Sequence, residues 1–446
     1  MERVFLNAAI GVGFFAAIGY AVDYSFQLVD MFWVARIGAG APTAIAVGSS
    51  LLFLILSLNE IVGVSSVAIF SRRYGAHKLR DTEEAIAQTL VLKLLLGIFS
   101  ALFFIFIIYC LLPFYGLSKK EYNYTINYTN IIWISIVLVP VYSSMMTALR
   151  TIGEASRTAL ISLGALIVNA GFNPLFIFGF GPFPALGIAG AAWATILAQL
   201  AAMTGCGFAL AHNRSGIRVF RRGVLRWDRT LIRDLFLLGL PIAGVMFLYN
   251  AEQALVTNIV ATFPEKISDG YGIGARISGF LFMTTFGVAL GVAVTVGQYL
   301  ARNQIEIIRN AMQRLMGYVV GVLSLIALIL DLSATAVMTA FTAESETIGS
   351  GAVFLNFIGV ANIGLGVLYC YNGVFEGAGR NVPPLIAACI MYVCFEFPAL
   401  WLVSSLHGFR LWSVWLIVVS ASWIGAFSIL YLYRSGQWYT NPSQGR

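Results

Sequence analysis

The residues of this sequence that could do chemistry are carboxylates placed inside long apolar stretches. A charged side chain in the middle of a bilayer costs several kcal/mol, so such residues usually face a partner or a water-filled cavity. We therefore treat them as candidates for binding a proton or a cation. They are Asp23, Asp30, Glu60, Glu252, Asp331 and Glu396.

Asp23, Gln27 and Asp30 follow one another at intervals of four and three residues, which places them along one face of a helix. We expect that face to look into a bundle of helices, with Asp30 as the functional carboxylate and Gln27 in a substrate cavity or secondary relay. Two plainer interpretations stay open. In one, Asp30 only marks the membrane interface beside Arg36; in the other, Asp23 makes a structural polar contact.

A second polar group lies in the stretch 158–180, where Asn169 and Asn173 are four residues apart and share a helical face. Pro174 lacks an N–H and so leaves a backbone carbonyl free. Thr195 adds a hydroxyl from the next stretch. Together with a carboxylate, these oxygens suit a small hard cation. Hydrogen bonding between helices would use the same residues and is the alternative.

An acidic and aromatic face follows Pro241, where Tyr249, Glu252 and Gln253 lie at i, i+3 and i+4. Such a surface suits an organic cation, through charge attraction and cation–π contact. We expect these residues to line a substrate cavity or to form a secondary relay. Glu60, in the middle of another apolar stretch, is a further candidate for a proton relay.

The elements that carry these residues are membrane-spanning helices. Of 446 residues, 59% are hydrophobic and 11% are charged, which excludes a water-soluble globule. One crossing takes about 20 apolar residues. The sequence therefore predicts an all-α polytopic membrane protein with twelve transmembrane helices. The predicted spans are 4–29, 43–70, 85–112, 129–149, 158–180, 185–211, 235–262, 271–300, 311–341, 348–375, 383–405 and 408–434.

The longest polar stretch divides the predicted spans into two six-helix lobes, and it holds seven arginines. We expect an N-lobe over 1–211, a basic cytoplasmic linker over 212–234, a C-lobe over 235–434 and a cytoplasmic tail over 435–446.

The positive charges predict the orientation. With a cytoplasmic N-terminus, 20 of the 27 Lys and Arg residues fall in cytoplasmic segments and 6 in outside segments. This asymmetry predicts a multi-pass protein of the cell membrane, inner or plasma, with both termini cytoplasmic. The net charge of +7 then comes from basic residues in the cytoplasmic loops, and it does not indicate nucleic-acid binding. We expect the lipid bilayer and small-molecule organic cations as partners, no nucleic acid, and a monomer.

Short segments of the two halves match in register. Tyr74–Lys78 after the second span resembles Tyr299–Asn303 after the eighth, and Gly153–Ala155 after the fourth faces Gly377–Gly379 after the tenth. Because each half has an even number of spans, such repeats are related by a pseudo-two-fold axis along the membrane normal. Transporters built this way hold substrate between the halves and alternate access by rocking.

The cysteines and histidines predict neither a metal centre nor a redox site. The five cysteines include no CxxC pair, and the three histidines fall in or beside predicted loops. A nucleophile with a base on one helical face is not evident either. We therefore expect a transporter rather than an enzyme, without a cofactor.

Several segments resemble the multidrug and toxic compound extrusion (MATE) family of secondary transporters, in its prokaryotic form. The match covers essentially the whole chain, and its most specific part is Pro184–Thr195, which follows Asn173–Phe178. The other matching segments are Val29–Gly38, Ser71–Ala76, Leu238–Pro241 and Gly377–Arg380.

The resemblance implies a twelve-helix, two-lobed antiporter that exports cationic amphipathic compounds in exchange for H⁺ or Na⁺. It also implies that the coupling cation binds at Asp30, with Asn169, Asn173, Thr195 and the carbonyl of Ala191. No other metal is implied beyond Na⁺ at this site. Desolvation of the carboxylate would let it take up H⁺ or Na⁺ from outside.

This sequence departs from the family pattern at two positions. Several relatives carry aspartate where Asn173 stands, so the site has one formal charge fewer. Another branch has a glutamate where Tyr249 stands, and Glu252 follows one turn later. The choice of ion and the role of Glu252 therefore stay open.

The nearest alternative is a flippase for lipid-linked precursors, which shares the two-lobe architecture. Such proteins commonly have additional spans and a basic cavity, whereas this chain has about twelve spans and acidic residues within them. A major facilitator transporter is a rival at the level of fold, but its charged loop signature is not evident between Ser71 and Arg80.

Overall fold

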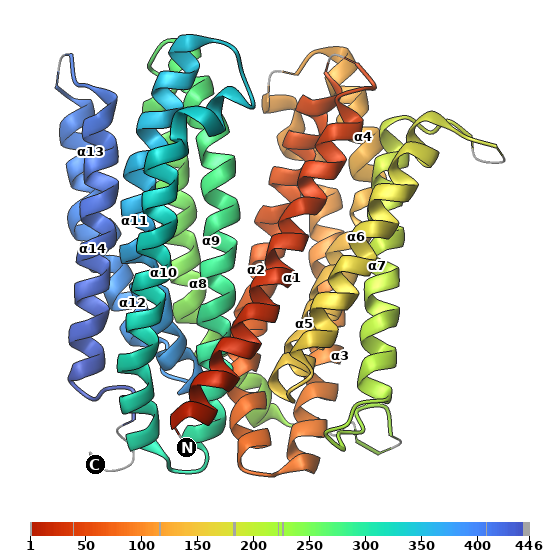
Figure 1. Cartoon of the computed structure of the whole chain (residues 1–446). Helices are drawn as coiled ribbons and strands as arrows, with labels where there is room; N and C mark the ends of the chain where they lie inside the picture. The colour runs from red at the N-terminus through yellow and green to blue at the C-terminus, as the bar shows by residue number, and fades with distance from the viewer. Residues whose placement is uncertain are drawn as a thin grey trace. The chain divides into compact units, whose positions relative to one another are not determined.

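The computed structural model describes residues 2–38, 40–115, 117–181, 184–221, 223–224, 227–406 and 408–439. Helices are the regular elements of these ranges (Figure 1). In the first half they are α1 (Glu2–Val34), α2 (Ala41–Gly75), α3 (Leu79–Leu111), η1 (Leu112–Tyr115), α4 (Lys119–Ile132), α5 (Ile134–Thr151), α6 (Ala155–Phe178) and α7 (Ile188–Ala211). In the second half they are α8 (Arg229–Val260), α9 (Glu265–Leu300), α10 (Ile305–Thr339), α11 (Ser345–Gly377), α12 (Val382–Ala388), η2 (Cys389–Glu396), α13 (Phe397–Ser404) and α14 (Leu411–Arg434).

Eleven helical segments within the described ranges are long and apolar enough to cross a membrane. The remaining predicted span, 43–70, lies within α2, where Thr43–Leu52 is a shorter apolar stretch. The all-α polytopic class is therefore confirmed.

Two predicted spans are built differently from a single α-helix. The span predicted at 129–149 is made by α4 and α5, which meet at Trp133. Helix α4 begins ten residues before that span, at Lys119, because Ser118 caps it by accepting from the Glu121 backbone N–H. The span predicted at 383–405 consists of α12, the π-helix η2 and α13 in succession.

Residue contacts divide the chain into two compact units. The first unit is Ile18–Gly239, and the second unit is Leu240–Arg446 together with Met1–Ala17. The division falls inside α8 rather than in the polar segment 212–234. The predicted boundaries of the N-lobe, linker, C-lobe and tail stay a prediction.

Glycines bring three helices of the second unit into close contact. A Cβ added to Gly287 of α9 would lie 2.3 Å from the Ala17 backbone of α1, and one added to Gly291 would lie 2.4 Å from the Ala9 carbonyl oxygen. On α11, a Cβ at Gly373 would come equally close to the carbonyl oxygen of Ala289. Such small-residue stripes let helix backbones approach in membranes, and here they explain why the start of α1 packs with the second half.

The turns that end corresponding helices have the same left-handed backbone. His77 after α2 and Asn303 after α9 both have φ of 58°. Gly153 after α5 has φ of 89°, and Gly379 after α11 has φ of 65°. The predicted pairing of Gly153 with Gly377 is therefore displaced by two residues, because Gly379 is the residue that ends its helix in the same way.

The beginning and the end of the described chain lie beside the start of α10. Glu2 accepts a hydrogen bond from the Asn310 amide at 3.1 Å and pairs with Arg314 at 3.3 Å. Arg309 donates to the Tyr439 hydroxyl at 3.4 Å. Both ends therefore lie at one end of the second unit (Figure 1). Their assignment to the cytoplasmic side stays a prediction.

Candidate functional site

Asp30 lies inside a helix, not at its end. Helix α1 continues to Val34, so Asp30 is one full turn before its last residue, and only 8% of its surface is exposed. This burial favours the functional interpretation of Asp30 over that of an interface marker beside Arg36, and both stay predictions. Arg36 instead lies with its guanidinium carbon 3.6 Å from the centre of the Phe32 ring.

Two neighbouring helices present the partners of Asp30. Helix α6 carries Asn169 and Asn173, both fully buried, and it runs through Pro174 to Phe178 without ending. Helix α7 begins at Ile188 and carries Thr195 two turns later. These two helices pack along each other in the first unit.

A close backbone contact fixes the start of α7 against the end of α6. The N–H groups of Leu186 and Gly187 donate to the carbonyl oxygens of Phe176 and Ile177, at 2.9 and 3.0 Å. A Cβ added to Gly190 would lie 2.3 Å from the Phe176 carbonyl oxygen. Only glycine fits there, and the contact sets the level at which α7 presents its hydroxyl to α6.

Three neutral donors hold the Asp30 carboxylate. Oδ1 accepts from the Asn173 amide at 2.8 Å and from the Asn169 amide at 3.1 Å. Oδ2 lies 3.0 Å from the Thr195 hydroxyl, which is also 3.0 Å from the Ala191 carbonyl oxygen. The five residues that the family resemblance implied for the coupling site are thus together in one network.

The arrangement can accept a proton without moving heavy atoms. The Thr195 hydroxyl has a single proton, which it donates either to Asp30 or to the Ala191 carbonyl. When Oδ2 of Asp30 is protonated, it can donate to Thr195, whose own proton then turns to Ala191. The Asn173 carbonyl oxygen is buried without a donor among the described residues and remains open to a cation.

The other two members of the α1 face differ from Asp30. Gln27 is exposed. Asp23 is half-buried and interacts with the guanidinium of Arg150, which lies 5.0 Å from the centre of the Tyr20 ring. Asp23 thus has a buried cationic partner, as the structural interpretation of this residue requires, whereas the donors around Asp30 are uncharged.

Two buried cations of the first unit were not among the predicted site residues. Arg150 lies just after the predicted span 129–149 and was therefore one of the 20 charges assigned to cytoplasmic segments, yet it is only 4% exposed. Lys93 of α3 is fully buried and donates to the backbone carbonyl of Asn59. Glu60 is exposed. Its Oε2 and the Lys93 Nζ would lie 2.7 and 3.1 Å from a Cβ added to Gly63, so both groups are close to that glycine. The relay role of Glu60 stays a prediction.

Tyr249, Glu252 and Gln253 line one pocket of the second unit. Its wall includes aromatic side chains from α9, α11 and α14 and a second carboxylate, Glu396. The predicted acidic and aromatic face therefore borders this pocket, and its role in substrate binding stays a prediction. Asp331, in contrast, is exposed on α10.

A family-wide sequence model, described as MatE, matches residues 16–175 and 241–402. The chain belongs to the MatE family. The match covers both halves and includes the helices that carry Asp30, Glu252 and Glu396.

Relatives and solved structures of MatE proteins extend over nearly the whole chain. The probable multidrug resistance protein YoeA of Bacillus subtilis is 21% identical, covering 92% of this chain and 89% of YoeA. The FAD transporter of Shewanella oneidensis is 22% identical, with the same two coverages. An outward-facing multidrug resistance MATE transporter of the MOP superfamily matches with a TM-score of 0.89 at 19% identity, covering 98% of this chain and 97% of that structure.

These findings confirm the predicted resemblance and the two-lobe helical fold. A MatE protein is a membrane transporter and not an enzyme, so that prediction is confirmed as well.

Proposed function

We propose that this MatE transporter is an antiporter that exports cationic amphipathic compounds in exchange for inward H⁺ or Na⁺, with Asp30 as the coupling residue. The observation that carries the proposal is a buried carboxylate whose hydrogen-bond donors, among the described residues, are the neutral groups of Asn169, Asn173 and Thr195. A charge in such a position is stabilised by taking up a proton or a small cation.

Coupling arises from a difference in ion affinity between two conformations. An ion that binds Asp30 more tightly in one conformation shifts the population toward it, by no more than that difference in affinity allows. If the exported compound binds the other conformation more tightly, the two ligands drive each other's release. Alternating access then couples them without a cofactor.

The acidic cavity of the second unit supports a cationic substrate. Glu252 and the aromatic rings around it match an organic cation better than an anionic lipid headgroup. YoeA, named a probable multidrug resistance protein, also favours drug export over a flippase. We further propose that the protein works as a monomer in the cell membrane with both termini cytoplasmic.

The test is efflux of ethidium from proteoliposomes under an imposed pH gradient or Na⁺ gradient. Wild type is compared with Asp30→Asn and with Asp331→Asn, a control that neutralises an exposed carboxylate. We expect one gradient to drive efflux, a loss of at least tenfold in Asp30→Asn, and no change in the control. The gradient that drives efflux identifies the coupling ion as H⁺ or Na⁺.

Two results would contradict the proposal. Wild type that moves no ethidium under either gradient removes the drug-antiport interpretation, and a lipid-scrambling assay then tests the flippase. Normal gradient-driven efflux by Asp30→Asn removes the coupling site but leaves the antiport.

A further inference from the structure

Lys93 is an ammonium group enclosed in the middle of a spanning helix. It is 0% exposed and lies near the middle of α3. Its ammonium donates to the backbone carbonyl of Asn59 on α2. An ammonium has three N–H donors and a full positive charge, so one carbonyl compensates it only in part. Charged side chains inside membrane proteins usually pair with an opposite charge, so we looked for a counter-charge beside Lys93.

Gly63 lets Lys93 reach the backbone of α2 and brings it close to a carboxylate. In a helix the carbonyl of residue 59 points toward residue 63, and a glycine at that position leaves the carbonyl open to a second donor. A Cβ added to Gly63 would lie 3.1 Å from the Lys93 Nζ and 2.7 Å from Oε2 of Glu60. The two charged atoms are therefore within about 6 Å of each other, a range in which opposite charges stabilise each other's ionised form. Glu60 is the counter-charge of Lys93.

A second carboxylate of the first unit also has a buried cation. The guanidinium of Arg150 interacts electrostatically with Asp23 of α1. Its Nε donates to the Thr158 hydroxyl of α6 at 3.4 Å. On the side of α1, the guanidinium lies 5.0 Å from the centre of the Tyr20 ring. Contacts with α1 and α6 thus hold this cation beside Asp23.

Asp30 is the third carboxylate of this set, and the donors around it are neutral. The remaining charged residues in the described helices of the first unit lie within two turns of a helix end. The interior of the unit therefore carries three carboxylates, Asp23, Asp30 and Glu60, and two cations, Lys93 and Arg150. One negative charge is left over, and it belongs to Asp30.

The other titratable groups near the two pairs are neutral ones. Tyr142 of α5 interacts electrostatically with Asp23 and with Glu60, and Cys206 of α7 interacts with Asp23. Phenols and thiols are mostly neutral at pH 7. They therefore do not replace Lys93 or Arg150 as a counter-charge.

Two further helices pack against α2, and their charges lie away from Glu60. Helix α4 carries its charged residues in its first turn, where Glu121 lies beside Gly40, which precedes Glu60 by twenty residues. Helix α8 contacts α2 where Gly239 lies against the Ile61 carbonyl. The charged residue of α8 closest to this contact in the sequence is Asp234, which is exposed.

We propose that Lys93 and Arg150 are positioning residues that keep Glu60 and Asp23 ionised, so that the first unit takes up one monovalent cation per cycle, at Asp30. A proton or Na⁺ at either paired carboxylate would share it with a fixed positive charge, which disfavours uptake there. Glu60 therefore does not relay protons. The inference rests on the proposed function, in which Asp30 is the coupling residue, and adds the number of ions that this unit carries.

The test is infrared difference spectroscopy of the purified full-length protein between pH 9 and pH 6. This method detects the carbonyl stretch of protonated carboxyl groups, to which lysine and arginine do not contribute. In wild type we expect one component of this band to be lost in Asp30→Asn. Glu60→Gln and Asp23→Asn should each leave the wild-type band unchanged, because both carboxyls stay ionised over this range.

The cation variants test why Glu60 and Asp23 stay ionised. Lys93→Met should add a component to the band, because Glu60 then has no cation beside it and takes up a proton. This component should be absent from Lys93→Met/Glu60→Gln and from Lys93→Arg, which retains the cation. Arg150→Met should likewise add a component, which should be absent from Arg150→Met/Asp23→Asn.

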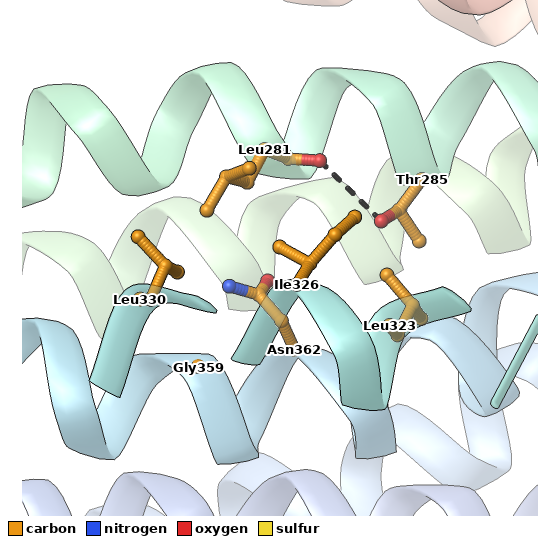
Figure 2. Close-up of a pocket in the computed structure, with 7 residues that line it drawn as sticks. All are labelled: Leu281, Thr285, Leu323, Ile326, Leu330, Gly359 and Asn362. Carbon is orange, nitrogen blue, oxygen red and sulfur yellow. Dashed lines mark hydrogen bonds between the residues drawn. The ribbon is translucent and has the colours of Figure 1, made fainter. Parts of the chain in front are cut away.

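Asn362 of the second unit provides the control for removing a buried polar side chain without removing a charge. Figure 2 shows Asn362 of α11 among Leu323, Ile326 and Leu330 of α10. Its amide nitrogen has no acceptor among the described residues. Asn362→Leu should give the wild-type band, so a new component in Lys93→Met reports the lost charge.

A wild-type component that is lost in Glu60→Gln or in Asp23→Asn would overturn the proposal, and this comparison needs no variant of the cations to fold. A Lys93→Met band equal to that of wild type would show that Lys93 does not hold Glu60 ionised. Thermal unfolding of each variant checks its integrity. Because neither a gradient nor ethidium is present, failure here is distinguishable from failure of antiport, which only the transport assay detects.

Discussion

Asn173 is the nearest hydrogen-bond donor to the Asp30 carboxylate among the described residues. Its Nδ2 lies 2.8 Å from Asp30 Oδ1. An amide donates to Asp30 and stabilises its charge, whereas a carboxylate would repel it. The identity of this side chain therefore adjusts how tightly the site holds a proton.

Replacing Asn173 with aspartate should strengthen proton binding at the site. Two carboxylates within hydrogen-bonding distance retain at least one proton or cation, because both cannot ionise together. In Asn173→Asp we expect the pH of half-maximal ethidium transport to rise by about one unit. Transport rates in proteoliposomes between pH 5 and 9 measure this shift. An unchanged pH profile would show that residue 173 does not act on Asp30.

Sequence reasoning predicted this site in part. The spacing of Asn169 and Asn173 predicts that they share a face, but it does not bring them to Asp30, which precedes Asn169 by 139 residues. That pairing depends on how α1, α6 and α7 pack, and the family resemblance supplied it. Glu396 had no predicted partner, because a π-helix shifts side chains off the period of 3.6 residues on which face assignments depend.

At the scale of elements, the contact between Gly190 and the end of α6 sets the position of Thr195. An alanine Cβ would lie 2.3 Å from the Phe176 carbonyl oxygen, so α7 would have to move away from α6. We expect Gly190→Ala to lower the free energy of unfolding by about 1–3 kcal/mol, as overpacking does. The midpoint of thermal unfolding in detergent measures it.

Gly207 provides the matched control for this change on the same helix. A Cβ there meets nothing within 4 Å, so Gly207→Ala tests helix propensity alone and should stabilise by up to about 1 kcal/mol. Equal effects of the two substitutions would show that the contact at Gly190 is not tight.

Apolar stretches predicted most helices because spanning segments have a strong compositional signal. The same rule missed the first turns of α4, since Lys119–Ile132 is polar and its helix depends on the Ser118 cap and on packing. It also placed Arg150 just outside the span 129–149, although that residue is buried by its tertiary contacts. Length and hydropathy predict spans, but not which polar groups the fold encloses.

At the scale of the whole molecule, the glycines of α9 hold the start of α1 in the second unit. Gly287→Ala/Gly291→Ala would place methyl groups 2.3 and 2.4 Å from backbone atoms of α1. We expect the double variant to lose at least 5 °C in its unfolding midpoint, in line with about 1–3 kcal/mol for each overpacked site. Gly272→Ala, with nothing within 4 Å, is the control on the same helix. A midpoint equal to that of the control would show that α1 does not need this contact.

Helix α1 therefore belongs to both units: residues 1–17 pack with the second, and Asp30 lies in the first. Its 33 residues contain no proline and form one continuous rod about 50 Å long (Figure 1). The close contacts of Gly287 and Gly291 of α9 fix the start of this helix within the second unit. Because the helix is continuous between residues 17 and 30, its direction at Asp30 can change independently of its packed start only if it bends within that segment.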